Sequence, residues 1–213
     1  MKHSLLTFAL CVFAMLFVGN AHAQWSTNPY TNNAISTAAN DQYSPTIVSD
    51  GAGGAIITWN DFRSWTNEGI YAQRIDSSGA VQWTANGVPI STAANNQYGP
   101  TIVSDGAGGA IITWYDYRSG TNGDIYAQRI NASGAVQWTA NGVPISTAAH
   151  NQGSPTIVSD GAGGAIITWN DYRSGTNGDI YAQWTNANAS NFQILAKILP
   201  ITDIPNDQGG KVS

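Results

Sequence analysis

The sequence has almost no cysteine, a single glutamate and few positive charges. Its one cysteine, Cys11, lies in the first 23 residues, so the rest of the chain has no disulfide, no thiolate metal ligand and no cysteine nucleophile. The chain has 8 Lys and Arg against 13 Asp and Glu, a formal net charge of −5. Because phosphate binding needs clustered Lys and Arg, this balance excludes a nucleic-acid partner.

The first 23 residues have the pattern of a secretory signal peptide. Lys2 and His3 precede an apolar run at 5–18, and the small-residue end Ala21–Ala23 follows it. We therefore expect an exported protein, either secreted or held in the periplasm or at the cell surface. Beyond this segment no stretch approaches the ~20 apolar residues that cross a bilayer, so no membrane span is expected.

Most of the remaining chain is a tandem repeat with a period of 55 residues. Residues 45–99 recur as 100–154 with identity at 45 of 55 positions. A third copy starts at Pro155 and matches the second at 28 of 29 positions up to Gln183, where the pattern stops. The resulting division is a signal peptide (1–23), a partial repeat with a last strand and linker (24–44), repeat 1 (45–99), repeat 2 (100–154), a truncated repeat 3 (155–191) and a divergent tail (192–213).

Each full copy contains four strand-like runs. In repeat 1 they are 45–49, 55–59, 70–75 and 80–84, separated by turns rich in Gly, Asn and Asp. Four antiparallel strands in about 40–55 residues is the size of one propeller blade. We predict an all-β fold, a β-propeller-like array of about three four-stranded antiparallel blades that is incomplete or open, because closed propellers have about 4–8 blades.

Three blades leave two blade faces without a neighbour. The sequence is compatible with an open arc that exposes apolar surface, with two chains that pair into a ring, and with further blades outside this product. Self-association that covers the exposed blade faces is therefore one expected interaction.

Three motifs resemble the repeats of a secreted bacterial β-propeller-type family. They are Asp-Gly-Ala-Gly-Gly-Ala-Ile-Ile-Thr-Trp at 50–59, Trp-x-Asp-[Phe/Tyr]-Arg-Ser at 59–64 and Asp-Ile-Tyr-Ala-Gln-Arg at 124–129. The likeness to TolB-type and BNR-type blades implies a propeller fold but no single function, since such blades serve scaffolds, adhesins and enzymes alike. Residues 201–213 resemble the opening strand of a fibronectin-like module, which implies either the front part of a longer protein or a truncated relative.

An aspartate and an arginine follow the second strand of every copy at fixed spacing. They could form a ring at one end of the array that binds sugar or carboxylate groups through charge-assisted hydrogen bonds. We favour the alternative that each pair ties its own blade's loop together, because a unit that recurs in every blade is explained by folding. The candidate ligand-binding residues are Asp61, Arg63, Trp65, Asp116, Arg118, Asp171 and Arg173.

The first hairpin of each copy carries an Asp-Gly-Ala-Gly-Gly turn. We interpret its aspartate as a turn cap and its glycines as residues that take a positive φ. A calcium site is disfavoured, because the cation wants about six to eight oxygens and the loop offers one carboxylate. The structural turn residues are Asp50, Gly51, Gly54, Asp105, Gly106, Gly109, Asp160, Gly161 and Gly164. We expect no metal and no other cofactor.

Trp65 is the most informative single departure between copies. It stands in a polar loop where the other copies have Gly120 and Gly175, so we expect it to be exposed. An exposed indole can stack on a sugar ring or anchor a protein partner. The alternative is that it packs on its own blade.

No catalytic constellation can be assigned from the sequence. A glycosidase needs two carboxylates at a controlled separation, whereas Glu68 is the only glutamate and His150 has no ligand or proton-transfer partner. We therefore expect a secreted, non-catalytic β-repeat protein that serves as a structural or ligand-binding module, with a glycan or a protein as its ligand. The alternative is a remnant of a glycan-acting, sialidase-like propeller hydrolase.

Overall fold

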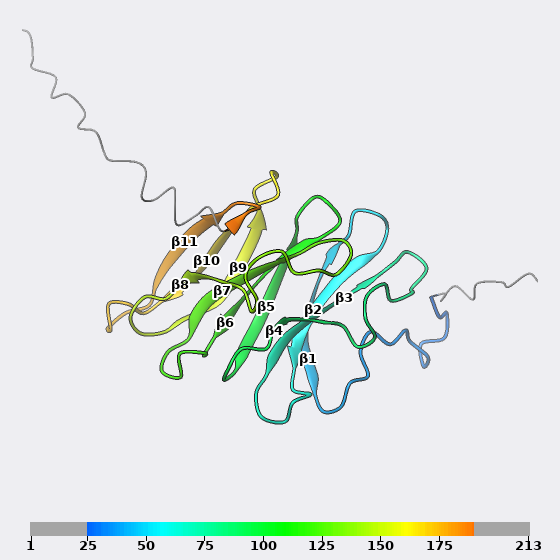
Figure 1. The fold of residues 1–213 in the computed structure, drawn as a ribbon, viewed down its shortest axis with the longest axis horizontal. Helices are drawn as coiled ribbons and strands as arrows, with labels where there is room; N and C mark the ends of the chain where they lie inside the picture. The colour runs from blue at the N-terminus through cyan, green and yellow to red at the C-terminus, as the bar shows by residue number, and fades with distance from the viewer. Residues whose placement is uncertain (1–24, 190–213) are drawn as a thin grey trace, which may run out of the picture.

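The computed structural model describes residues 25–189, which form three antiparallel β-sheets (Figure 1). The strands are β1 (Gln42–Ser49), β2 (Ala55–Asp61), β3 (Gly69–Ile75), β4 (Val88–Ser91), β5 (Gln97–Ser104), β6 (Ala110–Asp116), β7 (Asp124–Ile130), β8 (Val143–Ser146), β9 (Gln152–Ser159), β10 (Ala165–Asp171) and β11 (Asp179–Thr185). The predicted signal peptide and divergent tail lie outside these residues. Within them, no helix is long and apolar enough to cross a membrane.

The predicted all-β, open, propeller-like array is confirmed. The sheets β1–β4, β5–β8 and β9–β11 are blades 1, 2 and 3, and Figure 1 shows them side by side in chain order. The first strand of each blade contacts the first strand of the next, β1 with β5 and β5 with β9. One detail differs from the prediction. The third sheet has three strands among the described residues, without a counterpart of β4 and β8.

The predicted fourth strand at 80–84 is wrong, because Val88–Ser91 forms the outer strand of blade 1. In the 80–84 segment, the Gln73 side chain replaces part of the backbone pairing. Its Nε2 donates to the carbonyl of Thr84 (2.9 Å), and its Oε1 accepts the backbone N–H of Trp83 (2.9 Å). This segment therefore leaves the sheet and carries the Trp83 indole towards the next blade.

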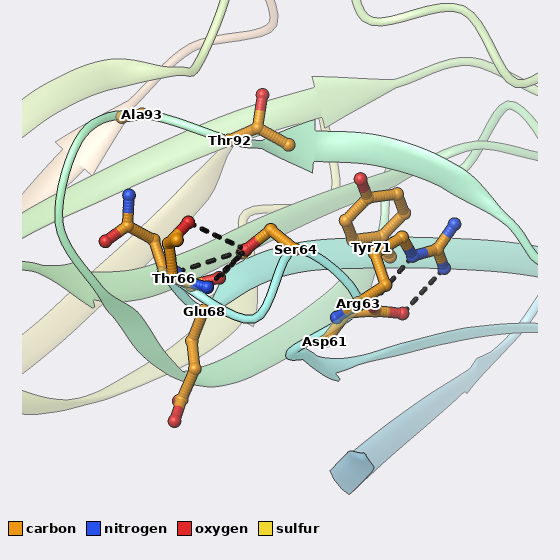
Figure 2. Close-up of a pocket in the computed structure, with 10 residues that line it drawn as sticks. Asp61, Arg63, Ser64, Thr66, Glu68, Tyr71, Thr92 and Ala93 are labelled. Carbon is orange, nitrogen blue, oxygen red and sulfur yellow. Dashed lines mark hydrogen bonds and ion pairs between the residues drawn. The ribbon is translucent and has the colours of Figure 1, made fainter. Parts of the chain in front are cut away.

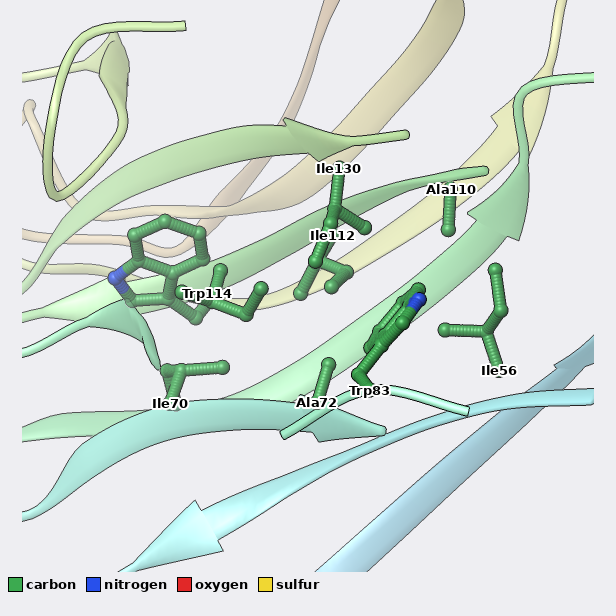
Figure 3. Packing of buried hydrophobic residues seen from close by; sticks show 9 residues of the cluster. Ile56, Ile70, Ala72, Trp83, Ala110, Ile112, Trp114 and Ile130 are labelled. Atoms are coloured by element: carbon green, nitrogen blue, oxygen red, sulfur yellow. The ribbon is translucent and has the colours of Figure 1, made fainter. Parts of the chain in front are cut away.

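The apolar core lies between the blades. Between blades 1 and 2, Ile56 and Ile70 face Ile112 and Trp114, with Trp83 in the same cluster (Figure 3). The cluster between blades 2 and 3 contains Ile125, Ala127, Ile167 and Trp169. Burial of these side chains between sheets supplies the main favourable free energy of blade stacking. Each blade thus has a front face, turned to the next blade, and a rear face, turned to the previous one.

Hydrogen bonds across the two blade interfaces repeat with the 55-residue period. They run from Thr46 Oγ1 to Pro100 O (3.1 Å), from Thr101 Oγ1 to Pro155 O (3.5 Å), from Trp83 Nε1 to Ala132 O (3.1 Å) and from Trp138 Nε1 to Ala187 O (3.0 Å). The same residue types at equivalent positions make these bonds at both interfaces, which explains how one repeated sequence builds the array.

The segment before β1 takes the place of a preceding blade on blade 1. Trp25 Nε1 donates to Ser77 O (2.9 Å), at the position where Trp83 Nε1 contacts blade 2. Asn33 Nδ2 donates to Gly79 O (2.9 Å) close by. This segment binds blade 1, at the opposite end of the array from blade 3 (Figure 1). Within the described residues, one chain therefore forms an open arc.

Candidate functional site

The recurring aspartate and arginine pairs are bound within their own blades. In blade 1, Asp61 accepts hydrogen bonds from Trp59 Nε1 (2.9 Å) and from Arg63 Nη2 (2.6 Å). The Arg63 guanidinium also donates to Asn86 O (2.7 Å) and lies 3.8 Å from the ring centroid of Tyr71. These contacts fix the loop between β2 and β3 onto the blade that carries it.

The pairs of the other two blades have the same geometry. Asp116 and Arg118 lie 2.6 Å apart, as do Asp171 and Arg173, and each arginine stacks on its own blade's tyrosine at 3.7 Å. Hydrogen bonds from Arg173 hold the pKa of Asp171 at about 2, below its usual value. Each of the three carboxylates is hydrogen-bonded to the arginine of its own loop, as the interpretation that each pair ties its own blade's loop together expects.

The turn aspartates cap the first hairpin of each blade and bind an arginine from the third strand. Asp50 Oδ1 accepts the backbone N–H groups of Ala52 and Gly54 (both 2.8 Å), and its Oδ2 accepts Arg74 (2.8 Å). Gly51 has a φ of +76°, which a residue without Cβ adopts without strain. Asp105 and Asp160 repeat the capping bonds, with Gly106, Gly109, Gly161 and Gly164 in the same positions.

Blade 3 replaces the arginine of this arrangement with a tryptophan. Trp184 pairs with Ile166 on β10, the register that Arg129 has in blade 2, and its Nε1 donates to Asp160 Oδ2 (2.8 Å). Trp184 belongs to β11 and keeps the turn aspartate bound with a neutral donor.

Differences between copies gather at one end of the blades. We call the end with the first hairpin the turn end, and the opposite end, where β2 passes into β3, the loop end. Repeats 1 and 2 differ at ten positions. In repeat-1 numbering, those at the loop end are 60, 62, 65, 68, 69, 95, 98 and 99, and those at the turn end, beside Gly53, are 76 and 77. The change between repeats 2 and 3, Tyr115 to Asn170, is also at the loop end.

The loop-end differences build a cluster of tyrosines around the single glutamate. Tyr43 of blade 1 donates its O–H to Glu68 Oε2. On blade 2, Tyr98 and Tyr115 lie with ring centroids 5.4 Å apart, and Tyr117 packs edge-on against Tyr115 at 5.8 Å. We call Tyr43, Glu68, Tyr98, Tyr115 and Tyr117 the tyrosine cluster. It joins two blades, because the Gln97 N–H donates to Glu68 O (3.0 Å) and the Glu68 N–H donates to Asn96 Oδ1 (3.0 Å).

The environment of the cluster raises the pKa of three of its phenols, those of Tyr43, Tyr98 and Tyr115. Burial, followed by the hydrogen bond to Glu68, raises the pKa of Tyr43 well above its usual value. Burial and the nearby Glu68 charge also raise the pKa of Tyr98. For Tyr115, burial and the neighbouring tyrosines have the same effect on the pKa. At neutral pH the cluster therefore presents hydroxyl donors, aromatic ring surface and one carboxylate acceptor.

An open pocket of about 410 Å³ adjoins the cluster on blade 2. Its lining residues are Asn95, Asn96, Tyr98, Tyr117 and Gly120. Two amides and two phenols can bond several hydroxyl groups while the rings supply apolar contact, the combination that ligand pockets use to orient polar molecules.

Trp65 stands at the loop position that Gly120 has in this blade 2 pocket. The Trp65 side chain is 72% exposed, contacts Phe62 edge-on at 6.1 Å and has a φ of +63°, a strained value for a residue with a Cβ. An exposed aromatic residue held in a strained backbone has no evident role in folding. Trp65 is thus placed at the loop end together with the other copy-specific residues.

A second pocket of about 100 Å³ lies in blade 1, between the loop that follows β2 and the segment Thr92–Ala93. Figure 2 shows the Ser64 hydroxyl at the centre of this loop, where it accepts the Asn67 N–H (3.1 Å), and the Glu68 carboxylate pointing away from Thr92 and Ala93. Glu68 therefore belongs to the tyrosine cluster more than to this pocket.

Asp124 is a further carboxyl group at the loop end, at the position of Gly69 in blade 1. It is 7% exposed, and burial together with the nearby Asp116 charge raises its pKa. The sequence analysis overlooked Asp124 and the tyrosine cluster. The sequence signal that could have identified these residues is that their positions differ between copies of the repeat. Within residues 25–189, no group of three or more His, Cys, Asp and Glu is arranged to hold a metal ion.

Comparisons with known proteins give one solved structure of similar fold. No family model matches the chain, and no curated protein matches it. The endo-arabinase from Bacteroides thetaiotaomicron is similar with a TM-score of 0.45 and 17% identity, over 69% of this chain and 56% of the enzyme. The chain thus spans just over half the length of that enzyme.

The prediction that the chain is not an enzyme is corrected by this comparison. The propeller-type structure to which the chain is similar is that of a glycosidase.

Proposed function

We propose that the protein acts on glycans and binds them at the loop end of blades 1 and 2. The observation that carries the proposal is that positions at which the copies differ gather in the tyrosine cluster and its adjoining pocket. Residues needed by every blade recur in every blade, whereas a single binding site requires residues that break the repeat. An exported protein would meet such polymers outside the cell.

The chemistry of the cluster suits a carbohydrate. Sugar rings have apolar faces that pack on aromatic rings, and their hydroxyl groups both donate and accept hydrogen bonds. Tyr98 and Tyr117 line the pocket with ring surface, and Asn95 and Asn96 add amide donors and acceptors. The Glu68 carboxylate provides the stronger, charge-assisted acceptor.

Hydrolysis is the second activity that the loop end supports. Glycosidases use two carboxyl groups, one as an acid with a raised pKa and the other as a base or nucleophile. Asp124 has a raised pKa, and Glu68 accepts a phenol hydrogen bond as a carboxylate does. These two residues are the carboxyl groups to test for catalysis in a glycan-acting, propeller-type hydrolase.

The repeat itself supplies the variants for the test. Glu68→Gly, Tyr98→Gly and Tyr115→Asn together convert the cluster to residues found at the equivalent positions of other copies. Asp76→Asn with Ser77→Ala makes the same kind of change at the turn end and is the matched control. Binding and hydrolysis are measured on a panel of polysaccharides that includes arabinan and sialylated glycans.

We expect the unaltered protein to bind at least one glycan of the panel. The loop-end variant should lose about tenfold or more in affinity, equivalent to about 1.4 kcal/mol, while the turn-end control keeps its affinity. Equal losses in both variants, or no binding to any glycan of the panel, would contradict the proposal. Gly120→Trp gives an independent check, because it fills the pocket with the residue that blade 1 has there.

A further inference from the structure

Within residues 25–189, the outer face of blade 3 is apolar and uncovered, and the outer face of blade 1 is covered only in part by the segment before β1. On the front face of blade 3, Ile180 is 74% exposed, whereas its counterparts Ile70 and Ile125 are fully buried. Ile166 and Val158, on the same face, are 44% and 57% exposed. A contiguous apolar surface of this kind on an exported domain marks an interaction site.

The rear face of blade 1 is the other open surface. Ile47 is 66% exposed, and a pocket of about 250 Å³ lies over this face between Ile35, Pro45, Ile57 and Trp59. In blades 2 and 3 the corresponding rear faces are covered by the blade before them, with Ile112 and Ile167 fully buried.

These two surfaces are the two halves of an interface that the molecule already contains twice. The front face of blade 3 keeps the apolar residues Val158, Ile166 and Ile180 with which blades 1 and 2 contact the following blade, although Trp184 stands in place of their arginine. The rear face of blade 1 keeps the residues that receive those contacts. Asn60 shows the correspondence in detail, because its Nδ2 donates to Gln97 O (2.9 Å) and its Oδ1 accepts Gly99 N–H (3.3 Å).

The same donors and acceptors are present on the open faces. Asn170 is the blade 3 counterpart of Asn60 and is exposed. Gln42 and Ser44 are the blade 1 counterparts of Gln97 and Gly99, and Ser44 has a φ of +52°, close to the +58° of Gly99. Blade 1 therefore presents the backbone shape to which such an asparagine binds.

The segment before β1 makes the same hydrogen bonds as the linker that joins blade 2 to blade 3. Gln42 Nε2 donates to the carbonyls of Ala39 (3.1 Å) and Asn40 (3.0 Å). The equivalent Gln152 makes the same bonds to Ala149 (3.2 Å) and His150 (3.0 Å) in the linker from blade 2. In sequence, 33–36 occupies the place of β4, the element without a described counterpart in blade 3.

From these observations we infer that the front face of blade 3 packs on the rear face of blade 1 of a second copy. Two copies joined at both ends make a closed, twofold-symmetric ring of six blades, within the range of about 4–8 blades that propellers have. The second copy's segment 33–36 then lies beside β11 as the outer strand of blade 3. This inference is independent of the glycan proposal, since it concerns opposite ends of the array.

Light scattering coupled to size-exclusion chromatography tests the inference on the purified protein. The measured mass should be twice that of one chain. Ile180→Asp should give a monomer, because it buries a charge in the proposed interface, whereas Val136→Asp, at a site 40% exposed on blade 2, should leave the dimer intact. The inference is wrong if the unaltered protein is a monomer, whatever covers blade 3 in that monomer. It is also wrong if the protein forms a series of larger oligomers.

Discussion

The turn end and the loop end of the blades have different roles, since the turn end stabilises each blade and the loop end holds the candidate site. At the turn end, Asp50 and Asp105 make the same capping bonds and the same arginine pairs, and only two positions differ between repeats 1 and 2. At the loop end, eight positions differ, and they bring Glu68, Tyr98 and Tyr115 together. Residues that every blade needs recur in every copy, whereas the candidate site is built at positions where at least one copy differs from the others.

The comparison predicts that substitutions at the turn end cost mainly stability. Gly109→Ala should have the largest effect, because a Cβ there would lie 2.2 Å from the carbonyl oxygen of Ile130. We expect the free energy of unfolding to fall by about 3 kcal/mol, as for overpacking a rigid site. Urea unfolding followed by tryptophan fluorescence measures this change.

Gly106→Ala is the matched control in the same turn. No atom lies within 4 Å of the Cβ that it would add, so only its φ of +75° opposes the substitution. We expect a loss of about 1 kcal/mol, the cost of a left-handed residue with a Cβ. If both variants lost the same stability, close packing of Gly109 would not be the reason for its glycine.

Acid should weaken the loop pairs that recur in each blade. Because Arg173 lowers the pKa of Asp171 to about 2, the pair stabilises the folded state fully above the unfolded pKa of 3.8. This stabilisation is lost as the pH falls from about 4 towards 2. It amounts to about 1 kcal/mol, since the Arg173 side chain is 36% exposed and solvent screens the pair.

Unfolding at a series of pH values between 4 and 2 measures this loss. Asp171→Asn removes the titrating group, so it should flatten the pH dependence over this range while lowering stability at neutral pH. An unchanged slope in Asp171→Asn would show that other carboxyl groups account for acid unfolding. Asp50, Asp61 and Asp105, whose pKa values are also lowered, are the next groups to substitute.

Trp65→Gly should have a small effect in the opposite direction. It introduces the residue that blades 2 and 3 have at this position and relieves the strain of a φ of +63°. The relief, about 1 kcal/mol, is partly offset by the lost Phe62 contact and the greater freedom of the unfolded chain. We expect a net gain of about 0.5 kcal/mol in unfolding free energy, and a net loss would assign Trp65 a role in folding.

The blade architecture could be predicted from the sequence because the repeat makes its turn signals visible several times. The Asp-Gly-Ala-Gly-Gly turn identified the first hairpin, and the period gave the number of blades. The outer strand was misplaced because 80–84 alternates like a strand, while the Gln73 side chain replaces its backbone pairing. No pattern in the local sequence shows that a side chain will replace the backbone hydrogen bonds of a sheet.

The candidate site could be predicted only in part. Trp65 and Glu68 stand out in the sequence as departures from glycine, but Tyr43, Tyr98 and Tyr115 lie on three different strands. Tyr98 and Tyr115 are paired across β5 and β6 of blade 2, but Tyr43 and Glu68 reach them only when blade 1 stacks on blade 2, which is information that a local pattern lacks. Comparison between copies would have identified most of them, since the positions that break the repeat are those of the cluster.

Glu68→Gly tests most directly whether the loop end serves binding and not stability. The free energy of unfolding and the glycan affinity are measured on the same preparation. The residue is glycine in repeats 2 and 3, so the free energy of unfolding should change by less than about 0.5 kcal/mol. The affinity for the bound glycan should fall about tenfold or more. A variant that loses stability in proportion to affinity, or that binds as well as the unaltered protein, would contradict the assignment of function to the loop end.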